Sequence, residues 1–308
     1  MGLVSQAQSI GSLARRVVMQ TGFEGRVLAC LREAVYLCGS DGLLMWVALP
    51  HHLPHRRAIL ARFDPSAVAV GSPVSMSEGC LVMAGLSAIR ISEAPCWSPP
   101  PVQRTRLSSW NALRDRLQAH MAQISEVPNR RGYGRLIGLP LGDLPGVESG
   151  DPDRVLWEAI LPPARELILT AQAEGLNGVF DPALELIGLG PGLTPAGDDF
   201  VGGLLFAVQQ LGRAYPERVR RNLVRRNAFL ERARGATSQI SFAILCDLAH
   251  GHGPEPMHAL LLALLHGEEP VRALSAAEAI TRIGHTSGWD MLAGMLIGLS
   301  LLVAQDGR

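Results

Sequence analysis

The sequence predicts an α+β protein: a β-rich N-terminal domain, either a small barrel or a sandwich, followed by a mainly α-helical C-terminal domain. Roughly the first hundred residues contain short apolar runs separated by glycine and polar residues, a pattern typical of short strands. A proline-rich segment at 97–101 ends this pattern, and beyond it the apolar residues recur at helical spacing. We therefore expect a β-rich domain over residues 1–105 and a mainly helical domain over residues 106–308, which carries the glycine-rich motifs.

The strands of the first domain are expected where apolar runs are bounded by turn-forming residues. The tetrapeptide Gly-Ser-Asp-Gly at 39–42 has the composition of a tight turn between two strands. The expected strands are Val27–Cys30, Ala34–Cys38, Leu43–Leu49, Ala67–Val70, Cys80–Ala84 and Ser87–Ile91.

The helices of the second domain are expected where apolar residues follow helical periodicity. The expected helices are Leu107–Ile124, Asp153–Glu174, Asp198–Leu211, Pro216–Ala233, Ser238–Ala249, Met257–Leu265, Ser275–Ile283 and Gly288–Ala304. Residues 127–151, rich in glycine, proline and arginine, should form a long ordered loop. The charge-free run 291–304 is shorter than the ~18–20 residues that cross a membrane, so a buried core helix is expected.

Composition restricts the chemistry. Apolar residues make up 47% of the chain, charged residues 18%, and the net charge is zero, which indicates a globular protein without general affinity for nucleic acid. All 28 basic residues are arginine, so a Schiff-base lysine, a lysine general base and a P-loop lysine are excluded. The five cysteines lack the CxxC spacing of zinc sites. No export signal is recognisable at the start, so we expect a cytoplasmic protein without a membrane partner.

The most informative segment, residues 188–200, reads Gly-Leu-Gly-Pro-Gly-Leu-Thr-Pro-Ala-Gly-Asp-Asp-Phe. Alternating glycines can adopt positive φ and bring backbone N–H groups close to a ligand. Thr194 is expected to cap a helix whose first residue is Pro195, and a helix N-terminus after a glycine loop favours anions. The loop can equally be a structural turn, because its spacing differs from the dinucleotide-binding fingerprint GxGxxG.

Asp198 and Asp199 allow two interpretations. Carboxylates in the first turn of a helix are stabilised by its dipole by ~0.3–1 kcal/mol, so this effect alone can explain them. Two carboxylates beside an anion site would nevertheless repel the anion, unless Mg²⁺ lies between them or the substrate carries an N–H donor. Asp198 and Asp199 are therefore candidate catalytic residues and candidate Mg²⁺ ligands.

A second segment, residues 284–294, resembles the first when the two are aligned by their Gly-x-Asp triplets. The aligned pairs are Gly197 with Gly288, Asp199 with Asp290, and Gly203 with Gly294. Our hypothesis is that the two helices pack glycine to glycine and direct both N-termini at one pocket. The alternative is that two buried helices share good capping chemistry by coincidence.

Further polar residues are candidates for the same site. Thr237 and Ser238 begin a third helix, where they serve either as ordinary N-terminal caps or as polar residues that line the same ligand site. His285 is a candidate acid–base or substrate-orienting group. The candidate catalytic residues are thus Asp198, Asp199, His285 and Asp290. The candidate substrate-binding residues are Gly190, Gly192, Leu193, Thr194, Gly197, Thr237, Ser238, Thr286, Ser287 and Gly288.

Two other groups of residues are less specific. The histidines of the segment 51–55 resemble a cluster of metal ligands, but they lie beside Pro50 and Pro54, and we interpret them as part of a solvated loop. The arginine-rich segment 213–234 is typical of a solvated helix face. The arginines nearest the motifs in the sequence, and so the first candidates to bind a carboxylate or phosphate, are Arg232, Arg234 and Arg282.

The string Gly-x-Gly-Leu-Thr-Pro-x-Gly-Asp-Asp-Phe at 190–200, followed by Gly-His-Thr-Ser-Gly-x-Asp at 284–290, resembles a bacterial family formerly of unknown function. That family includes the AllH-type subunit of oxamate carbamoyltransferase. Residues 237–238 match more loosely, and Ala196 stands where the family often has serine.

The resemblance implies a role in carbamoyl transfer: the phosphorolysis of oxalurate to oxamate and carbamoyl phosphate during allantoin breakdown, together with FdrA-like partner subunits. The implied ligand is a small anion such as phosphate, carbamoyl phosphate or an oxamate-like molecule. Two alternatives stay open. One is a Mg²⁺-dependent enzyme acting on another small phosphate ester, and the other is a non-catalytic partner subunit whose glycines only pack helices.

Overall fold

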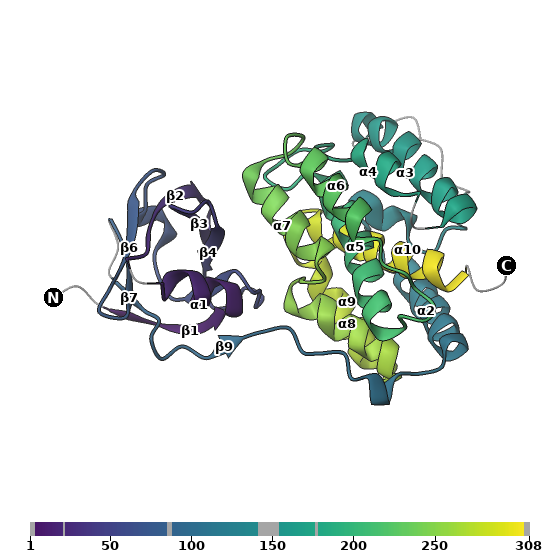
Figure 1. Cartoon of the computed structure of the whole chain (residues 1–308), viewed down its shortest axis with the longest axis horizontal. Helices are drawn as coiled ribbons and strands as arrows, with labels where there is room; N and C mark the ends of the chain where they lie inside the picture. The colour runs from purple at the N-terminus through teal and green to yellow at the C-terminus, as the bar shows by residue number, and fades with distance from the viewer. Residues whose placement is uncertain (1–3, 21, 85–87, 141–153, 176–177, 305–308) are drawn as a thin grey trace. The chain divides into compact units, whose positions relative to one another are not determined.

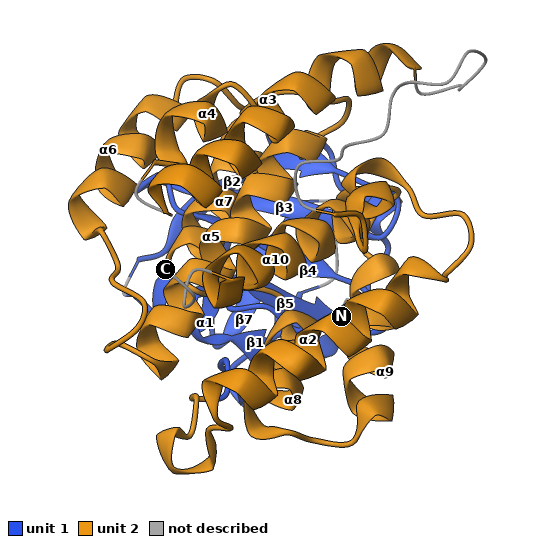
Figure 2. Cartoon of the chain, turned by 90° about the vertical axis from the view of Figure 1, so that its right-hand side faces the viewer, with its two compact units in different colours: residues 1–100 blue, residues 101–308 orange. Residues whose placement is uncertain are grey.

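The computed structural model of the chain separates into two compact units, Met1–Pro100 and Pro101–Arg308, coloured separately in Figure 2. It describes residues 4–20, 22–84, 88–140, 154–175 and 178–304. The expectations for residue 87, for residues 141–151 and for residue 153 lie outside the described residues.

The first unit is built on one sheet. Its strands are β1 (Ser5–Gly11), β2 (Glu24–Cys30), β3 (Ala34–Gly39), β4 (Leu44–Ala48), β5 (Ala58–Ala61), β6 (Pro73–Ser77), β7 (Cys80–Met83), β8 (Ile89–Arg90) and β9 (Cys96–Trp97). They follow the order β5-β4-β3-β2-β6-β7-β8-β1-β9, and an additional pairing of β1 with β5 closes the first eight into a barrel. The ninth strand extends the sheet beside β1. The prediction of an α+β fold with a small β-rich N-terminal part is confirmed, and the β-rich part is a barrel.

The turn between β3 and β4 forms as the sequence predicts. Gly42 has a φ of 80°, a value that favours glycine, and the Asp41 side chain accepts a hydrogen bond from the Leu43 N–H at 2.9 Å. The ladder that follows pairs Ala34 with Ala48. It also brings the Leu49 N–H to the carbonyl oxygen of Glu33, at 3.0 Å.

Several elements of the barrel differ from the prediction. The helix α1 (Ser12–Val18) follows β1 directly and adds buried apolar side chains to the barrel core, a connection that the mixed polar sequence of β1 does not reveal. Residues 67–70 form no strand. The short 3₁₀ helix η1 (Pro65–Ala67) extends into this segment instead. It forms because the Asp64 side chain accepts the Ser66 N–H and a proline follows at the first helical position.

The second unit is helical. Its α-helices are α2 (Trp110–Ser125), α3 (Arg154–Glu174), α4 (Phe180–Leu184), α5 (Ala196–Ala214), α6 (Leu223–Ala233), α7 (Gln239–Ala249), α8 (Glu255–His266), α9 (Pro270–Thr281) and α10 (Ser287–Ala304). Two 3₁₀ helices, η2 (Arg104–Arg106) and η3 (Gly132–Leu136), accompany them.

Several features of the helices differ from the prediction, among them the start of α9 at Pro270 where Ser275 was expected. The helix expected from Pro216 begins only at Leu223, because the Asn222 side chain caps it by accepting the Arg225 N–H at 3.0 Å. The helix α4 was not expected from the periodicity. In α5, Pro195 occupies the capping position and no side chain caps the helix, so the expectation that Thr194 is the cap is wrong.

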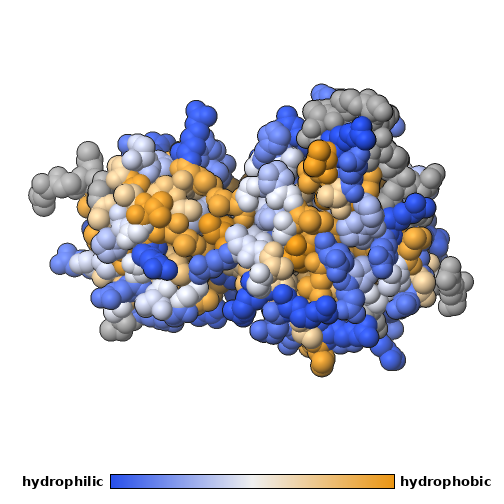
Figure 3. Space-filling model, turned by 90° about the horizontal axis from the view of Figure 1, so that it is seen from above, coloured by the Kyte–Doolittle hydropathy of each residue, from blue (hydrophilic) through white to orange (hydrophobic). Residues whose placement is uncertain are grey.

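The helices α5 and α10 form the centre of this unit and lie side by side (Figures 1 and 2). Among the described residues, α10 is long and apolar enough to cross a membrane by composition, but 83% of that span is buried inside the structure. The helix α10 is therefore a buried core helix, as predicted from its charge-free run. Elsewhere hydrophobic residues reach the surface among hydrophilic ones, as the face in Figure 3 shows.

Glycines allow α5 and α10 to approach closely. A Cβ atom on Gly203 of α5 would lie 2.2 Å from the carbonyl oxygen of Met291, and one on Gly294 of α10 would lie 1.9 Å from that of Phe200. These contacts are reciprocal, because Phe200 and Met291 are themselves an aligned pair of the two motifs. The close packing of the two helices at their aligned glycines is therefore confirmed, and the common pocket at their N-termini stays a prediction.

Replacing Gly294 by alanine should destabilise the protein by about 1–3 kcal/mol, because the new methyl group would overlap a backbone carbonyl that cannot move independently of α5. The midpoint of thermal unfolding should fall by roughly 2–4 °C for each kcal/mol. Gly235→Ala is the matched control, since a Cβ there meets nothing within 4 Å. Equal midpoints for the two variants would contradict the packing argument.

Candidate functional site

The loop before α5 takes the conformation that its glycines permit. Gly188, Gly190 and Gly192 have φ values of 83°, 121° and 98°. At Gly190 a Cβ atom would also lie 2.7 Å from the Ala196 backbone nitrogen. Alternating glycines are therefore required by the backbone here, and Leu193 next to them is 38% exposed at the surface.

Asp198 holds this loop in place. Its Oδ1 accepts the Gly188 N–H at 2.6 Å, and its Oδ2 accepts the hydroxyls of Thr237 and Ser241. Since the side chain is 2% exposed, these donors replace water around a buried carboxyl group. Asp198 thus joins the glycine loop to the start of α7, and Ser241 is a residue of this network that the sequence analysis missed.

The start of α7 also contacts the loop directly. The Ser238 side chain caps α7 by accepting the Ser241 N–H at 3.1 Å, as predicted, and its hydroxyl donates to the carbonyl oxygen of Leu193 at 2.9 Å. With the Thr237 contact to Asp198, the third hydroxyl-rich helix start therefore lies against the first motif.

The two motifs meet at their hydroxyl groups. Thr194 Oγ1 and Ser287 Oγ lie 2.9 Å apart, one before α5 and the other at the first residue of α10. Both hydroxyls are in hydrogen-bonding contact with the carboxyl group of Asp199. Thr194 therefore links the two motifs instead of capping its own helix.

Asp199 is a buried carboxyl group whose ionised form is destabilised by its surroundings. It is 2% exposed, and burial raises its pKa well above the usual range. Ser287 and Thr194 act in the opposite direction by hydrogen bonding, while the neighbouring charges of Asp290 and Asp198 raise the pKa further. Its surroundings therefore favour the protonated form more than water does.

Asp290 occupies the equivalent position on α10 and is fully buried, with 0% exposure. Its Oδ1 accepts the backbone N–H of Tyr133 at 2.7 Å, and Thr286 also hydrogen bonds to it. Burial nevertheless raises its pKa to about 7. The charge of Asp290 contributes to the raised pKa of Asp199, so the two aligned carboxyl groups interact electrostatically.

The 3₁₀ helix η3 adds Tyr133, which the sequence analysis missed. Its ring stacks on Phe200 at 4.3 Å between centroids, and burial followed by the charges of Asp290 and Asp198 raises the pKa of its hydroxyl well above the usual range. Gly132 makes the approach possible, because a Cβ there would lie 2.1 Å from Asp290 Oδ1. The pair of glycines around Tyr133 is the sequence signal that could have suggested a close backbone approach.

Three buried polar atoms in this region lack a hydrogen-bond partner within the described part of the chain. They are Asp199 Oδ2, Asp290 Oδ2 and the Tyr133 hydroxyl. Buried polar groups without partners cost about 1–3 kcal/mol each, so a cluster of them points to a function.

The remaining candidates lie at the surface or in other contacts. His285 is exposed, and its carbonyl oxygen lies 3.5 Å from Nη1 of Arg131, an arginine that the sequence analysis did not single out. The arginines that it did single out form surface ion pairs: Arg232 with Asp181, Arg234 with Glu231, and Arg282 with Glu278.

The predicted Mg²⁺ ligands Asp198 and Asp199 do not belong to a cluster of three or more metal-binding side chains among the described residues. Among the described residues, the group of metal-binding side chains whose ligand atoms converge within 4.8 Å is Glu33, His51 and His52, in the other unit. Since Asp198 is already surrounded by protein donors, a metal role for Asp198 and Asp199 stays a prediction.

The raised pKa of Asp290 makes stability depend on pH. An aspartate has a pKa of about 3.9 when unfolded. In the folded protein the value is about 7. Between these values the unfolded chain releases a proton that the folded chain keeps, so stability should fall as pH rises, by at most ~1.4 kcal/mol per pH unit.

Asp290→Asn keeps an oxygen to accept the Tyr133 N–H and cannot ionise. Urea unfolding of both proteins from about pH 4 to 7.5 should show the variant gaining stability relative to the wild type as pH rises. The exposed Asp115→Asn serves as the control. A constant difference between wild type and Asp290→Asn would show that Asp290 titrates normally.

Comparison with known proteins agrees with the motifs. No solved structure matches the chain. The model of a protein family described as oxamate carbamoyltransferase subunit AllH matches residues 186–299, a segment that runs from before the glycine loop almost to the end of α10. The resemblance expected from the sequence is thereby confirmed: over residues 186–299, which contain both motifs, this chain matches the AllH family.

Proposed function

We propose that this chain is a subunit of a carbamoyltransferase-type enzyme and binds a small phosphate- or carboxylate-bearing ligand where its two motifs meet. The observation that carries the proposal is the 2.9 Å contact between Thr194 Oγ1 and Ser287 Oγ above the buried carboxyl group of Asp199. It brings two helix N-termini and a glycine loop to one place, and each of these favours an anion.

In this proposal Asp199 binds the ligand in its protonated form, which burial favours, and this removes the conflict that two carboxylates beside an anion site would create. A protonated carboxyl group carries no charge and donates a hydrogen bond, so it can face an oxyanion or a carbonyl oxygen without repulsion. Asp290, with a pKa of about 7, exists in both protonation states near neutral pH and is suited to proton transfer.

In the proposed reaction, a phosphate oxygen attacks the carbamoyl carbon of oxalurate. A C–O bond forms as hydrogen phosphate gives up its proton, the C–N bond breaks, and the departing nitrogen takes a proton and becomes the amide of oxamate. Asp290 is suited to supply that proton, and Thr194 and Ser287 are suited to orient the ligand. Catalysis then rests on orientation and on stabilisation of charge, without a covalent intermediate.

Partner subunits, FdrA-like by the resemblance, are part of this proposal. The hydroxyls of Thr194 and Ser287 are half-buried, whereas Gly192, Leu193 and His285 are exposed at the same end of α5 and α10. This surface can receive a partner that completes the ligand site. Arg131, beside the carbonyl of His285, is the arginine that we propose to contact the phosphate.

Ligand binding can be tested by thermal unfolding of the purified chain with phosphate, carbamoyl phosphate, oxamate and oxalurate, alone and with partner subunits. A ligand at about 100 times its Kd should stabilise the folded state by ~2.7 kcal/mol. Ser287→Ala and Thr194→Val should each weaken that effect, because they remove the hydroxyls at the junction of the motifs.

Ser125→Ala is the control, since its hydroxyl donates only within its own helix, to the Ala122 carbonyl. It should respond to ligand like the wild type. If carbamoyl phosphate stabilises all three variants as strongly as the wild type, the ligand binds elsewhere. If no ligand acts even with partner subunits present, the chain is a non-catalytic partner.

A further inference from the structure

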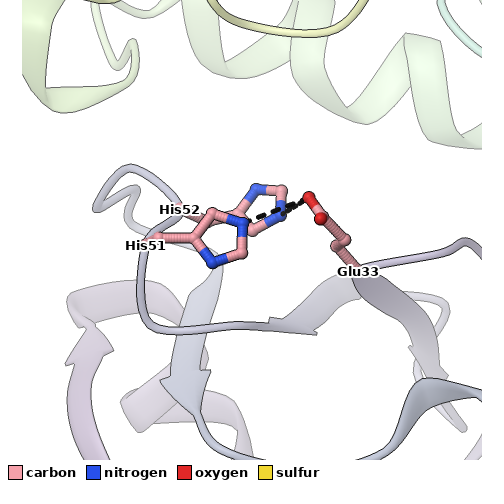
Figure 4. Close-up of side chains that lie close together, drawn as sticks. All are labelled: Glu33, His51 and His52. Atoms are coloured by element: carbon pink, nitrogen blue, oxygen red, sulfur yellow. Dashed lines mark hydrogen bonds and ion pairs between the residues drawn. The ribbon is translucent and has the colours of Figure 1, made fainter.

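A cluster of three metal-binding side chains lies in the barrel unit, outside the segment that matches the AllH family. Glu33 comes directly before β3, and His51 and His52 follow β4. The β3–β4 ladder fixes their approach, since it pairs Ala34 with Ala48 and continues to the hydrogen bond between Leu49 and Glu33. Figure 4 shows both imidazole rings directed at the same carboxyl group.

The distances in this cluster fit one metal ion. His51 Nε2 lies 3.1 Å and His52 Nε2 lies 3.3 Å from the same atom, Glu33 Oε2, and the ligand atoms are all within 4.8 Å of one another. Nitrogen and oxygen ligands about 2.0–2.1 Å from a tetrahedral zinc ion are separated by roughly 3.3 Å. Little rearrangement is therefore needed for all three groups to share a cation.

Both imidazole rings contact one carboxylate oxygen. His51 Nε2 and His52 Nε2 both face Glu33 Oε2, so two nitrogen atoms share a single acceptor. Two protonated imidazoles with ring centroids 4.9 Å apart would also repel each other. A metal ion would accept a lone pair from each neutral imidazole ring and would be attracted by the negative charge of the carboxylate.

His55 is not part of this cluster, although the sequence groups the three histidines. It is 4% exposed, its ring stacks on Trp46 at 4.8 Å, and its Nδ1 accepts the Arg57 N–H. The interpretation of the whole segment as a solvated loop is therefore wrong for His55. Its burial fixes the far end of the loop that carries His51 and His52.

We propose that Glu33, His51 and His52 form a binding site for a divalent transition-metal ion of the zinc type, with a remaining coordination position open to water or to another ligand. Imidazole nitrogens with one carboxylate oxygen suit zinc and its neighbours in the first transition series more than Mg²⁺ or Ca²⁺. The bound ion would tie the loop after β4 to the residue before β3.

The test is a titration of the purified, reduced full chain with Co²⁺, followed by absorption spectroscopy, and then with Zn²⁺ in competition. We expect one ion per chain, displaced by Zn²⁺, with a spectrum that lacks a thiolate charge-transfer band. That absence excludes the five free cysteines as ligands. Zn²⁺ should also raise the thermal midpoint of the chain.

His51→Ala, His52→Ala and Glu33→Gln should each raise the Kd for Co²⁺ at least about tenfold, since each removes a direct ligand. Glu93→Gln, an exposed carboxylate of the same unit, is the matched control and should leave the Kd unchanged. Unaltered circular dichroism of the metal-free variants would show that they fold.

Three outcomes would overturn the proposal: no Co²⁺ binding by the wild type, binding with a thiolate band, or an equal Kd in the wild type and the three variants. An increase of Kd in the control as large as in the variants would also overturn it, because binding would then reflect surface charge in general. Since the site lies outside the proposed carbamoyltransferase motifs, none of these results bears on that function.

Discussion

The close approach of α5 and α10 is the constraint on which the helical unit depends. Each helix places a glycine against a backbone carbonyl of the other, Gly203 against Met291 and Gly294 against Phe200. Because these four positions correspond in the two motifs, the helices begin at equivalent residues, Ala196 and Ser287. Equivalent glycines near those starts, Gly197 and Gly288, would each place a Cβ 1.9 Å from the carbonyl of a preceding segment. The similarity of the two sequence motifs thus corresponds to equivalent backbone contacts at the two helices.

The same packing creates the electrostatic character of the site. Asp199 and Asp290 lie in the first turns of the two packed helices and are buried, and burial is the main cause of the raised pKa of each. A protein under selection for stability alone would gain by replacing such groups with apolar ones. Keeping buried carboxyl groups with unpaired oxygens is a cost that ligand binding or proton transfer can explain.

Local signals were enough to predict the parts of the site that lie close together in the sequence. The positive φ values of the loop, the Ser238 cap of α7 and the glycine contacts follow from residue types and their spacing. The role of Tyr133 could not be predicted, because its N–H reaches Asp290 across 157 positions in the sequence, from a segment without helical periodicity. The same limit applies in the barrel, where strand register decides that His51 and His52 meet Glu33 while His55 is buried.

Asp198 and Asp199 show most clearly why residue type alone does not assign a role. Successive residues of a helix point about 100° apart, so two adjacent aspartates at a helix start face different neighbours. Asp198 faces the glycine loop and α7, where a backbone N–H and two hydroxyls satisfy both oxygens. Asp199 faces α10, where one oxygen stays unpaired and the neighbouring group is another carboxyl. The first arrangement fixes a conformation, whereas the second leaves a buried carboxyl group with an unpaired oxygen where the two motifs meet, which is the arrangement that the proposed ligand site uses.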